Sequence, residues 1–286
     1  MKIKELHSWN EFGGAVDELQ QRHQIDKTDW PEEVHTPDLV FRGQSDAGLN
    51  LETTLERAIA GKQKLIDYYS LIQKARSRIE TFADKHWDKF PNDTEFQEWL
   101  KAKDSTRLSY SPELLEYMIY LRHYGFPSPL LDWSRSPYIA AYFAFRDYRS
   151  TAKSVAIFAY RSYVGAKIFK SYGPGNRLAK PNITLIEADI RSDQRHFLQQ
   201  SRYTVCTEGV GSELSYCSHE VVVEDQNLIK DVLQQDLLLK IIVPASERRK
   251  ALRELESYNI NAYSLFPSEE SLMETVFLRE HLIPSK

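Results

Sequence analysis

The chain has 286 residues, of which 42% are hydrophobic and 27% charged, and its formal net charge is −4. This composition is that of an ordinary globular protein, so it excludes an intrinsically disordered chain, and the negative charge excludes a uniformly basic nucleic-acid-binding surface while leaving local basic patches open. No apolar run approaches the roughly 20 residues of a membrane span, and the opening segment MKIKELHSWNEF lacks the apolar core of a signal peptide.

The N-terminal part of the chain is predicted to be mostly helical. Residues 2–6 form a short strand, and Ser8 with Glu11 has the capping-box spacing that starts a helix to about Arg22. Further helices are expected over 53–61, 62–87 and part of 91–110. The basic helix over 62–87 is interpreted as a packed helix with a solvated face, and alternatively as a surface for nucleic acid or a partner protein.

A second strand, predicted over 38–41, ends in Arg42-Gly43-Gln44. An arginine at the end of an apolar strand, followed by glycine, commonly presents a cation at a cleft, where its planar fork suits phosphate or carboxylate. The alternative is an edge arginine paired with a surface acid. The residues alone leave both readings open.

The stretch 122–145, RHYGFPSPLLDWSRSPYIAAYFAF, joins two predicted helices and organises the rest of the chain. The first helix ends near His123. The second follows a capping serine, Ser134 or Ser136, with Pro137 at its first position, where a missing N–H costs nothing. Its residues are apolar almost all round, so we expect this helix to be buried.

Polar side chains crowd the predicted turn between these two helices, among them His123, Asp132, Trp133 and two serines. Buried polar groups need hydrogen-bond partners, and arranging them is costly. The turn is therefore a candidate site, with a purely structural network as the alternative. In that alternative Asp132 anchors the turn, the helix dipole stabilises His123, Trp133 belongs to the core and Ser136 is only a cap.

The C-terminal half is predicted to contain most of the strands, with a loop over 207–220 and helices over 245–258 and 268–282. The strands are expected over 154–160, 183–186, 203–206 and 237–243. Helices early and strands late indicate an α+β fold, here a single domain over 1–286 with a helical insertion at about 60–110. Two cysteines, Cys206 and Cys217, are too few for a disulfide framework, so we expect a reduced, cytoplasmic protein.

Familiar catalytic motifs are missing from the sequence. It has no P-loop, no GxGxxG, no CxxC pair and no HExxH, and its eight histidines are scattered, so no metal site is predicted. No serine lies in a GxSxG elbow, which argues against a hydrolase triad around 123–136.

Three separated segments carry a resemblance to a known family. The first is Phe41-Arg42-Gly43-Gln44, the second runs from His123-Tyr124-Gly125-Phe126-Pro127 through Leu130-Leu131-Asp132-Trp133-Ser134 to Ser136-Pro137, and the third contains Arg195, Gln199-Gln200 and Tyr203. Together they resemble the FRG-domain family, named for its Phe-Arg-Gly motif, over about 38–285 apart from the helical insertion. The chain departs from that family at Ser128-Pro129, where Thr-Arg is usual, and at Ser201, where glycine is usual.

The FRG layout is in turn similar, more loosely, to ADP-ribosyltransferases of the Arg-Ser-Glu type. Arg42-Gly43 matches the arginine, Ser134 or Ser136 matches the serine ahead of an Ala/Phe-rich helix, and Gln199 or Glu208 takes the place of the glutamate. The resemblance implies an ADP-ribosyltransferase-like core of mixed or antiparallel sheet with an early helical insertion. It also implies that NAD is a substrate.

The implied chemistry gives each candidate a role. Arg42 binds the NAD pyrophosphate, and an aromatic ring, Tyr124 or Trp133, stacks on the nicotinamide. His123 or Ser134 holds a ribose hydroxyl, and a carboxylate or amide stabilises oxocarbenium character at the ribose. The predicted catalytic residues are Arg42, Asp132, Ser134 and Gln199. The predicted NAD-binding residues are Arg42, Gly43, Gln44, His123, Tyr124, Trp133 and Arg195.

The FRG family occurs in bacterial and phage-related settings. The resemblance therefore implies an NAD-dependent ADP-ribosyltransferase-like toxin or phage-defence effector that modifies a nucleic acid or a protein, with an antitoxin or chaperone as partner and no membrane association. One alternative is a non-catalytic FRG module that binds a nucleotide or a partner protein. Another is an NAD-independent transferase or nuclease that uses His123 and Asp132. The enzymatic site requires the segments near 42, 123–136 and 195–203 to meet in one pocket.

Overall fold

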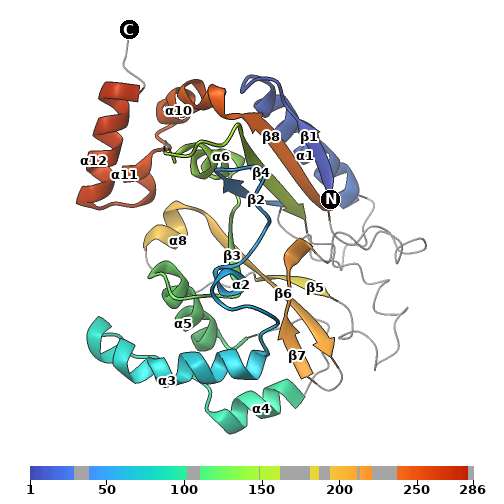
Figure 1. Cartoon of the computed structure of the whole chain (residues 1–286), viewed down its shortest axis with the longest axis vertical. Helices are drawn as coiled ribbons and strands as arrows, with labels where there is room; N and C mark the ends of the chain where they lie inside the picture. The colour runs from blue at the N-terminus through green and yellow to red at the C-terminus, as the bar shows by residue number, and fades with distance from the viewer. Residues whose placement is uncertain are drawn as a thin grey trace.

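A mixed β-sheet forms the centre of the fold (Figure 1). The computed structural model describes residues 1–28, 39–101, 110–147, 149–161, 181–186, 194–210, 213–220 and 237–282. Within them the sheet has eight strands in the order β1-β8-β4-β2-β3-β6-β5, with β7 paired to β6. The strands are β1 (Lys2–Glu5), β2 (Leu39–Gln44), β3 (Leu130–Ser134), β4 (Ser154–Arg161), β5 (Asn182–Ile186), β6 (Ser201–Val210), β7 (Glu213–Tyr216) and β8 (Leu237–Pro244).

The sheet is almost divided between β2 and β3. Strand β2 pairs with β4 along six residue pairs, whereas its antiparallel pairing with β3 consists of Phe41 opposite Ser134. All the other pairs of neighbouring strands are antiparallel except β1 and β8, which run parallel. The β2 and β3 strands therefore diverge from one another at the residues that follow this single pair.

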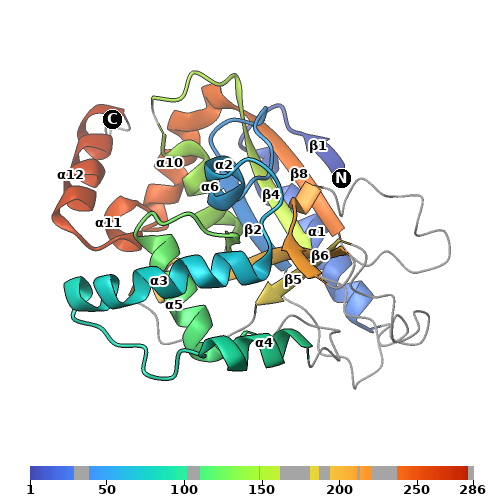
Figure 2. The same ribbon diagram turned by 60° about the horizontal axis from the view of Figure 1, so that its bottom comes forward.

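Helices cover the two parts of the sheet separately. The helices α1 (Glu11–Thr28), α6 (Pro137–Phe145) and α10 (Arg248–Ser257) share a core cluster with β2, β4 and β8. The helices α3 (Leu65–Ala83), α4 (Asp93–Lys101) and α5 (Pro112–His123) share another with β3, β6 and β7. Figure 2 shows α3 lying across α5, where Tyr117 donates to the carbonyl of Ile72. Shorter elements are α2 (Thr54–Ala58), α8 (Gln194–Leu198), a 3-10 turn (Ala245–Glu247), α11 (Ala262–Leu265), α12 (Glu269–Phe277) and a π-helical turn (Leu278–Leu282).

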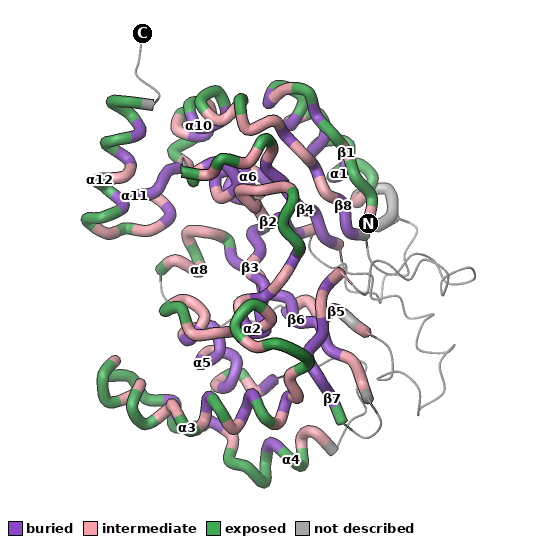
Figure 3. Tube along the Cα trace, in the orientation of Figure 1, coloured by how far each residue is buried: buried purple, intermediate pink, exposed green. Residues whose placement is uncertain are grey.

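A third cluster lies on the other face of the central strands. Alternation along β2 and β4 sends Phe41 and Ile157 to the α6 side and Val40 and Phe158 to this face, which Leu51 covers. Figure 3 accordingly shows the central strands as mostly buried. None of the helices in the described ranges combines the length and apolar character of a membrane span.

Helix α6 packs directly on the backbone of β2. It is buried, as predicted from its apolar composition, and Ala140 and Ala144 face the strand. A Cβ at Gly43 would lie 1.8 Å from the carbonyl oxygen of Ala140 and 2.6 Å from the nitrogen of Ala144. Only a glycine fits this contact, so the structure gives Gly43 a packing function.

The α+β class is confirmed, and most predicted elements are present. The loop predicted over 207–220 is wrong as far as Tyr216, because β6 continues to Val210 and β7 occupies Glu213–Tyr216. Polar residues hid these strands, since Thr207 and Ser215 are small buried residues and Glu208 is paired with Lys62. The polar turn predicted around Leu130–Trp133 is also wrong, because these residues form β3.

Two other boundaries differ from the prediction. Helix α1 extends to Thr28 instead of ending near Arg22. The helix predicted within 91–110 is α4, and residues 102–109 of that segment lie outside the described residues. A single domain with a helical insertion at about 60–110 stays a prediction.

We expect Gly43→Ala to destabilise the protein by about 3 kcal/mol or more, because the added Cβ meets helix backbone that cannot move aside. Urea denaturation followed by circular dichroism measures the free energy of unfolding. Gly14→Ala is the matched control, since Gly14 is exposed in α1 and nothing lies within 4 Å of a Cβ built there. Unchanged stability of Gly43→Ala would contradict the packing assigned to β2 and α6.

Candidate functional site

Arg42 bridges the opening between β2 and β3. Its Nη1 donates to the backbone oxygen of Asp132 at 2.8 Å and lies 3.9 Å from the Oδ2 atom of the same residue. The contact is made one residue beyond the single β2–β3 pair. The first and second predicted segments therefore meet, as the sequence analysis required.

Arg122, which the sequence analysis did not select, is the strongest partner of Asp132. Its Nε and Nη2 donate to Oδ2 of Asp132 at 3.0 and 2.6 Å, and its Nη1 donates to Oγ1 of Thr54 at 3.1 Å. The residue lies in the last turn of α5, directly before His123. A basic residue in the last turn stabilises any helix through the helix dipole, so its position in the sequence alone does not mark Arg122 as part of a site.

The Asp132 carboxylate is held in its ionised form. Burial raises its pKa, but the charges of Arg122 and Arg42 and the hydrogen bond from Arg122 outweigh that effect and leave the pKa below its ordinary value. The side chain is still 39% exposed, so a ligand can reach it. Burial acts oppositely on Arg42 and lowers its pKa to about 10, against the favourable charge of Asp132.

Positive charge exceeds negative charge around this carboxylate. The charges of Arg122 and Arg57 repel the charge of Arg42 and lower its pKa, whereas the carboxylate of Asp132 raises that pKa. The Nε atom of Arg42 is buried and has no hydrogen-bond partner among the described residues. Buried donors are nearly always satisfied in proteins, so this N–H marks a place where an acceptor is expected.

The third predicted segment meets the second through Tyr203, which is buried on β6. The hydroxyl of Tyr203 lies 3.0 Å from Nε2 of His123 and 3.4 Å from Nδ1 of His196. Figure 1 shows α8, which carries His196, between the end of α5 and α11. His123 thus bonds Tyr203, while Asp132 bonds Arg122.

Ser134 and Gln199 also meet, but through the backbone of Gln199. The Oγ of Ser134 donates to the Gln199 carbonyl at 2.8 Å and accepts from the nitrogen of Ser136 at 3.0 Å. The amide of Gln199 donates to the carbonyl of Leu265 at 3.1 Å, so it binds α11. Ser136 is the N-cap of α6, as its structural alternative predicted.

Trp133 lies in the core, where a ligand has no access to its ring. It is 3% exposed, and its indole N–H donates to Oγ1 of Thr204 at 2.7 Å. The same oxygen lies 2.9 Å from Nε2 of His219. His219 is fully buried, and no described residue is a partner of its Nδ1. The predicted stacking of Trp133 on nicotinamide does not fit this environment, and Trp133 instead fixes β3 to β6.

The other candidates lie around this centre. Gln44 donates to the carbonyl of Asn50 in the turn after β2, and Arg195 lies over the ring of Phe266 at 5.7 Å. Tyr124 is 64% exposed beside Tyr120, so it remains accessible for stacking. Glu208, the alternative acid, is bound to Lys62.

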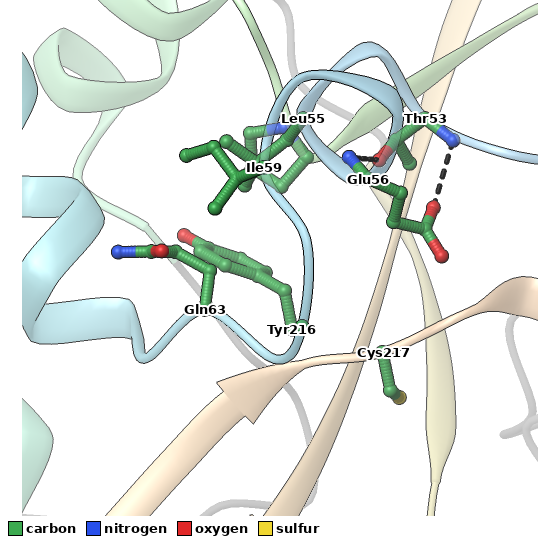
Figure 4. A pocket seen from close by; sticks show the side chains of 9 residues that line it. Thr53, Leu55, Glu56, Ile59, Gln63, Tyr216 and Cys217 are labelled. Carbon is green, nitrogen blue, oxygen red and sulfur yellow. Dashed lines mark hydrogen bonds between the residues drawn. The ribbon is translucent and has the colours of Figure 1, made fainter.

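A small pocket lies between α2 and the end of β7. Its lining includes Leu55, Ile59, Tyr216 and Cys217, and the reciprocal bonds between Thr53 and Glu56 form a capping box at its edge (Figure 4). Thr54, which accepts from Arg122, is the first residue of the same helix. Among the described residues no group of three or more His, Cys, Asp or Glu side chains could hold a metal.

The class defined by this geometry is an α+β protein with a mixed sheet and a charged cluster where two strands diverge. Comparison with known families adds that residues 37–153 match the FRG domain, which spans the segment from β2 through α6. This confirms the FRG resemblance over that range. No curated protein matches the chain, and no solved structure matches it.

Asp132→Asn is expected to destabilise the protein by about 1–2 kcal/mol, a value reduced for the partial exposure of the carboxylate, because Arg42 and Arg122 lose their counter-charge. The difference in the free energy of unfolding between the variant and the wild type is fully present above pH 3.8, the ordinary pKa of an aspartate. It shrinks as the pH falls through the lower pKa that Asp132 has in the folded protein. Urea denaturation between pH 2.5 and 7 measures it, with those two limits chosen to bracket the titration.

The control for this variant is Glu18→Gln, which removes an exposed acid that also contacts two cations, Lys4 and Arg22. We expect little change in stability there, because exposed ion pairs contribute little. Equal effects at the two positions would show that the Asp132 cluster is an ordinary surface network.

His219 is expected to make stability depend on pH below neutrality. Burial lowers its pKa from 6.5 to about 3, so between these values the unfolded chain binds a proton that the folded protein does not. Stability therefore falls on acidification, with a slope approaching about 1.4 kcal/mol per pH unit from this residue. His219→Gln should flatten the dependence measured by urea denaturation, whereas His86→Gln, at an exposed position, should leave it unchanged.

Proposed function

We propose that the Arg42–Arg122–Asp132 cluster binds the pyrophosphate of NAD, and that the protein is an ADP-ribosyltransferase-like enzyme. The observation that carries the proposal is the unsatisfied, buried Nε of Arg42 within a cluster that has more arginines than acids. A phosphate supplies both the missing acceptor and the missing negative charge. Arginine binds phosphate through two parallel N–H groups, and Nε belongs to one such pair.

Asp132 is the residue best placed for the sugar. The contacts of its carboxylate with the two arginines all use Oδ2, so among the described residues Oδ1 is left for a ligand. Cleavage of the bond between nicotinamide and ribose develops positive charge on the sugar. An ionised carboxylate stabilises that charge directly, or accepts a ribose hydroxyl and fixes its position. The exposed ring of Tyr124 is the remaining candidate for stacking on the nicotinamide.

The structural parallels to the Arg-Ser-Glu enzymes are an arginine on β2, a serine on β3 followed by the apolar helix α6, and β6 on the far side of β3. Ser134 supports the site from within, since it joins β3 to the Gln199 backbone. These parallels support the transferase reading, in which we propose that Asp132, and not Gln199, acts on the reacting sugar.

A second candidate function is nucleotide binding without catalysis. It is favoured by the two arginines that already neutralise Asp132 and by the amide of Gln199, which is engaged with Leu265. A carboxylate with two cationic partners stabilises a developing cation less than a solitary one does. The third reading, a nuclease or transferase built on His123 and Asp132, is less favoured because the two side chains bond different partners.

The target and the partner are proposed on the FRG resemblance. The target is a nucleic acid or a protein, and an antitoxin or chaperone is the proposed partner. Neither proposal names the surface of the chain that would bind the target or the partner.

Arg42→Ala should weaken NAD binding by about 10- to 100-fold, because a bidentate charged contact to the pyrophosphate is lost. Isothermal titration calorimetry with NAD measures the dissociation constant. Arg42→Lys keeps the charge without the planar fork and should recover only part of the affinity. Arg253→Ala removes an exposed arginine of α10 and should bind NAD like the wild type.

Incubation of the protein with labelled NAD and cell lysate then separates the two candidate functions. Label that enters a nuclease- or protease-sensitive product, and is lost in Arg42→Ala, supports the transferase. Binding of NAD without transfer of label supports the non-catalytic module. If NAD does not bind to a folded wild-type protein, the proposal as a whole is wrong.

A further inference from the structure

We infer that Cys206 and Cys217 form a redox-sensitive dithiol that closes to a disulfide when hydrogen peroxide reaches it. The two sulfurs lie 3.1 Å apart, and neither is in a disulfide in this structure. This inference is independent of the proposed NAD chemistry, since it concerns the β6–β7 strand pair and not the arginine cluster.

The backbone already holds the two cysteines in position. Cys217 follows β7 and continues its pairing with β6, because its nitrogen donates to the carbonyl of Cys206 at 3.1 Å. Directly opposed residues on antiparallel strands have Cα atoms about 4.5–5.5 Å apart, which lies within the range that a disulfide spans. The sulfurs must approach by about 1 Å to reach a bond length of about 2.05 Å, so rotation of the side chains suffices.

Both thiols are buried, which excludes a large oxidant from direct contact with them. Cys206 is 1% exposed and Cys217 9% exposed. Cys217 belongs to the wall of the pocket beside α2, and Figure 4 shows its sulfur pointing away from the other lining residues. Hydrogen peroxide is small and uncharged, so it suits this site better than a peptide disulfide does.

The reaction has two balanced steps. The Cys217 thiol loses its proton as its sulfur attacks one oxygen of hydrogen peroxide. The O–O bond breaks, which leaves a sulfenic acid and hydroxide, and the hydroxide takes up the proton that the thiol released to form water. The Cys206 sulfur then attacks the sulfenic sulfur, and the S–O bond breaks as a second water leaves. Two thiols are oxidised by two electrons in total, and one peroxide is reduced to two waters.

The crosslink fixes a segment that supports the rest of the third core cluster. His219 and Glu220 lie two and three residues after Cys217. His219 contacts Thr204, and Glu220 accepts from the backbone nitrogen of Leu51. Thr204 in turn holds Trp133, the neighbour of Asp132 on β3. Closing the disulfide therefore restrains residues 217–220, which include the buried His219, against β6.

The chain contains two cysteines in all, so the test is unambiguous. The full chain is treated with increasing hydrogen peroxide, denatured, alkylated with iodoacetamide, and digested with a protease that cuts after glutamate. Cleavage after Glu208 and Glu213 separates the two cysteines. The expected product is a pair of peptides joined by a disulfide within one chain, which dithiothreitol converts into two alkylatable thiols.

Cys206→Ser and Cys217→Ser serve as controls. In Cys206→Ser the remaining Cys217 should accumulate as sulfenic acid, trapped by dimedone, whereas in Cys217→Ser the more deeply buried Cys206 should react several-fold more slowly. The inference is overturned if both cysteines remain alkylatable at peroxide concentrations that already oxidise the exposed Met273. So would sulfinic acid or disulfide-linked dimers as the main products, because either shows that the sulfurs do not meet.

Discussion

The interaction on which the structure depends is the bond from Arg42 to the backbone of β3. Strands β2 and β3 share a single residue pair, so the sheet at this point has few backbone bonds to hold its two parts together. The guanidinium group replaces part of the missing ladder by donating to the Asp132 carbonyl, and Arg122 draws the side chain of Asp132 towards α5 and α2. The same charges that join the strands also produce the unbalanced cluster proposed to bind pyrophosphate.

This dual use explains why the cluster combines strong bonds with an unsatisfied donor. A guanidinium that served structure alone would be expected to have all its buried N–H groups paired. A guanidinium that served a ligand alone would not need to bond the neighbouring strand. Within the described part of the chain, Arg42 is anchored at Nη1 and has no partner at Nε, as expected of a residue whose position is fixed before a ligand arrives.

The sequence allowed the main elements and the meeting of three distant segments to be predicted, because strand and helix patterns and the FRG resemblance both bear on them. Arg42 does reach Asp132, and the segments around His123 and Ser134 do contact those around Tyr203 and Gln199. Arg122 was missed because a cation in the last turn of a helix is ordinary. The direction of a side chain was beyond prediction, so Trp133 and Gln199 were given roles that their hydrogen bonds do not favour.

The close contact between Gly43 and α6 fixes more than packing. Side chains alternate across a strand, so inserting or deleting one residue within β2 would move the arginine to the opposite face of the sheet and bring a side chain against the helix backbone. Strand β2 thus tolerates no change in its length without displacing Arg42 and Gly43 from their faces of the sheet. Loops elsewhere in the chain carry no such restriction, and variation in length is expected to accumulate there instead.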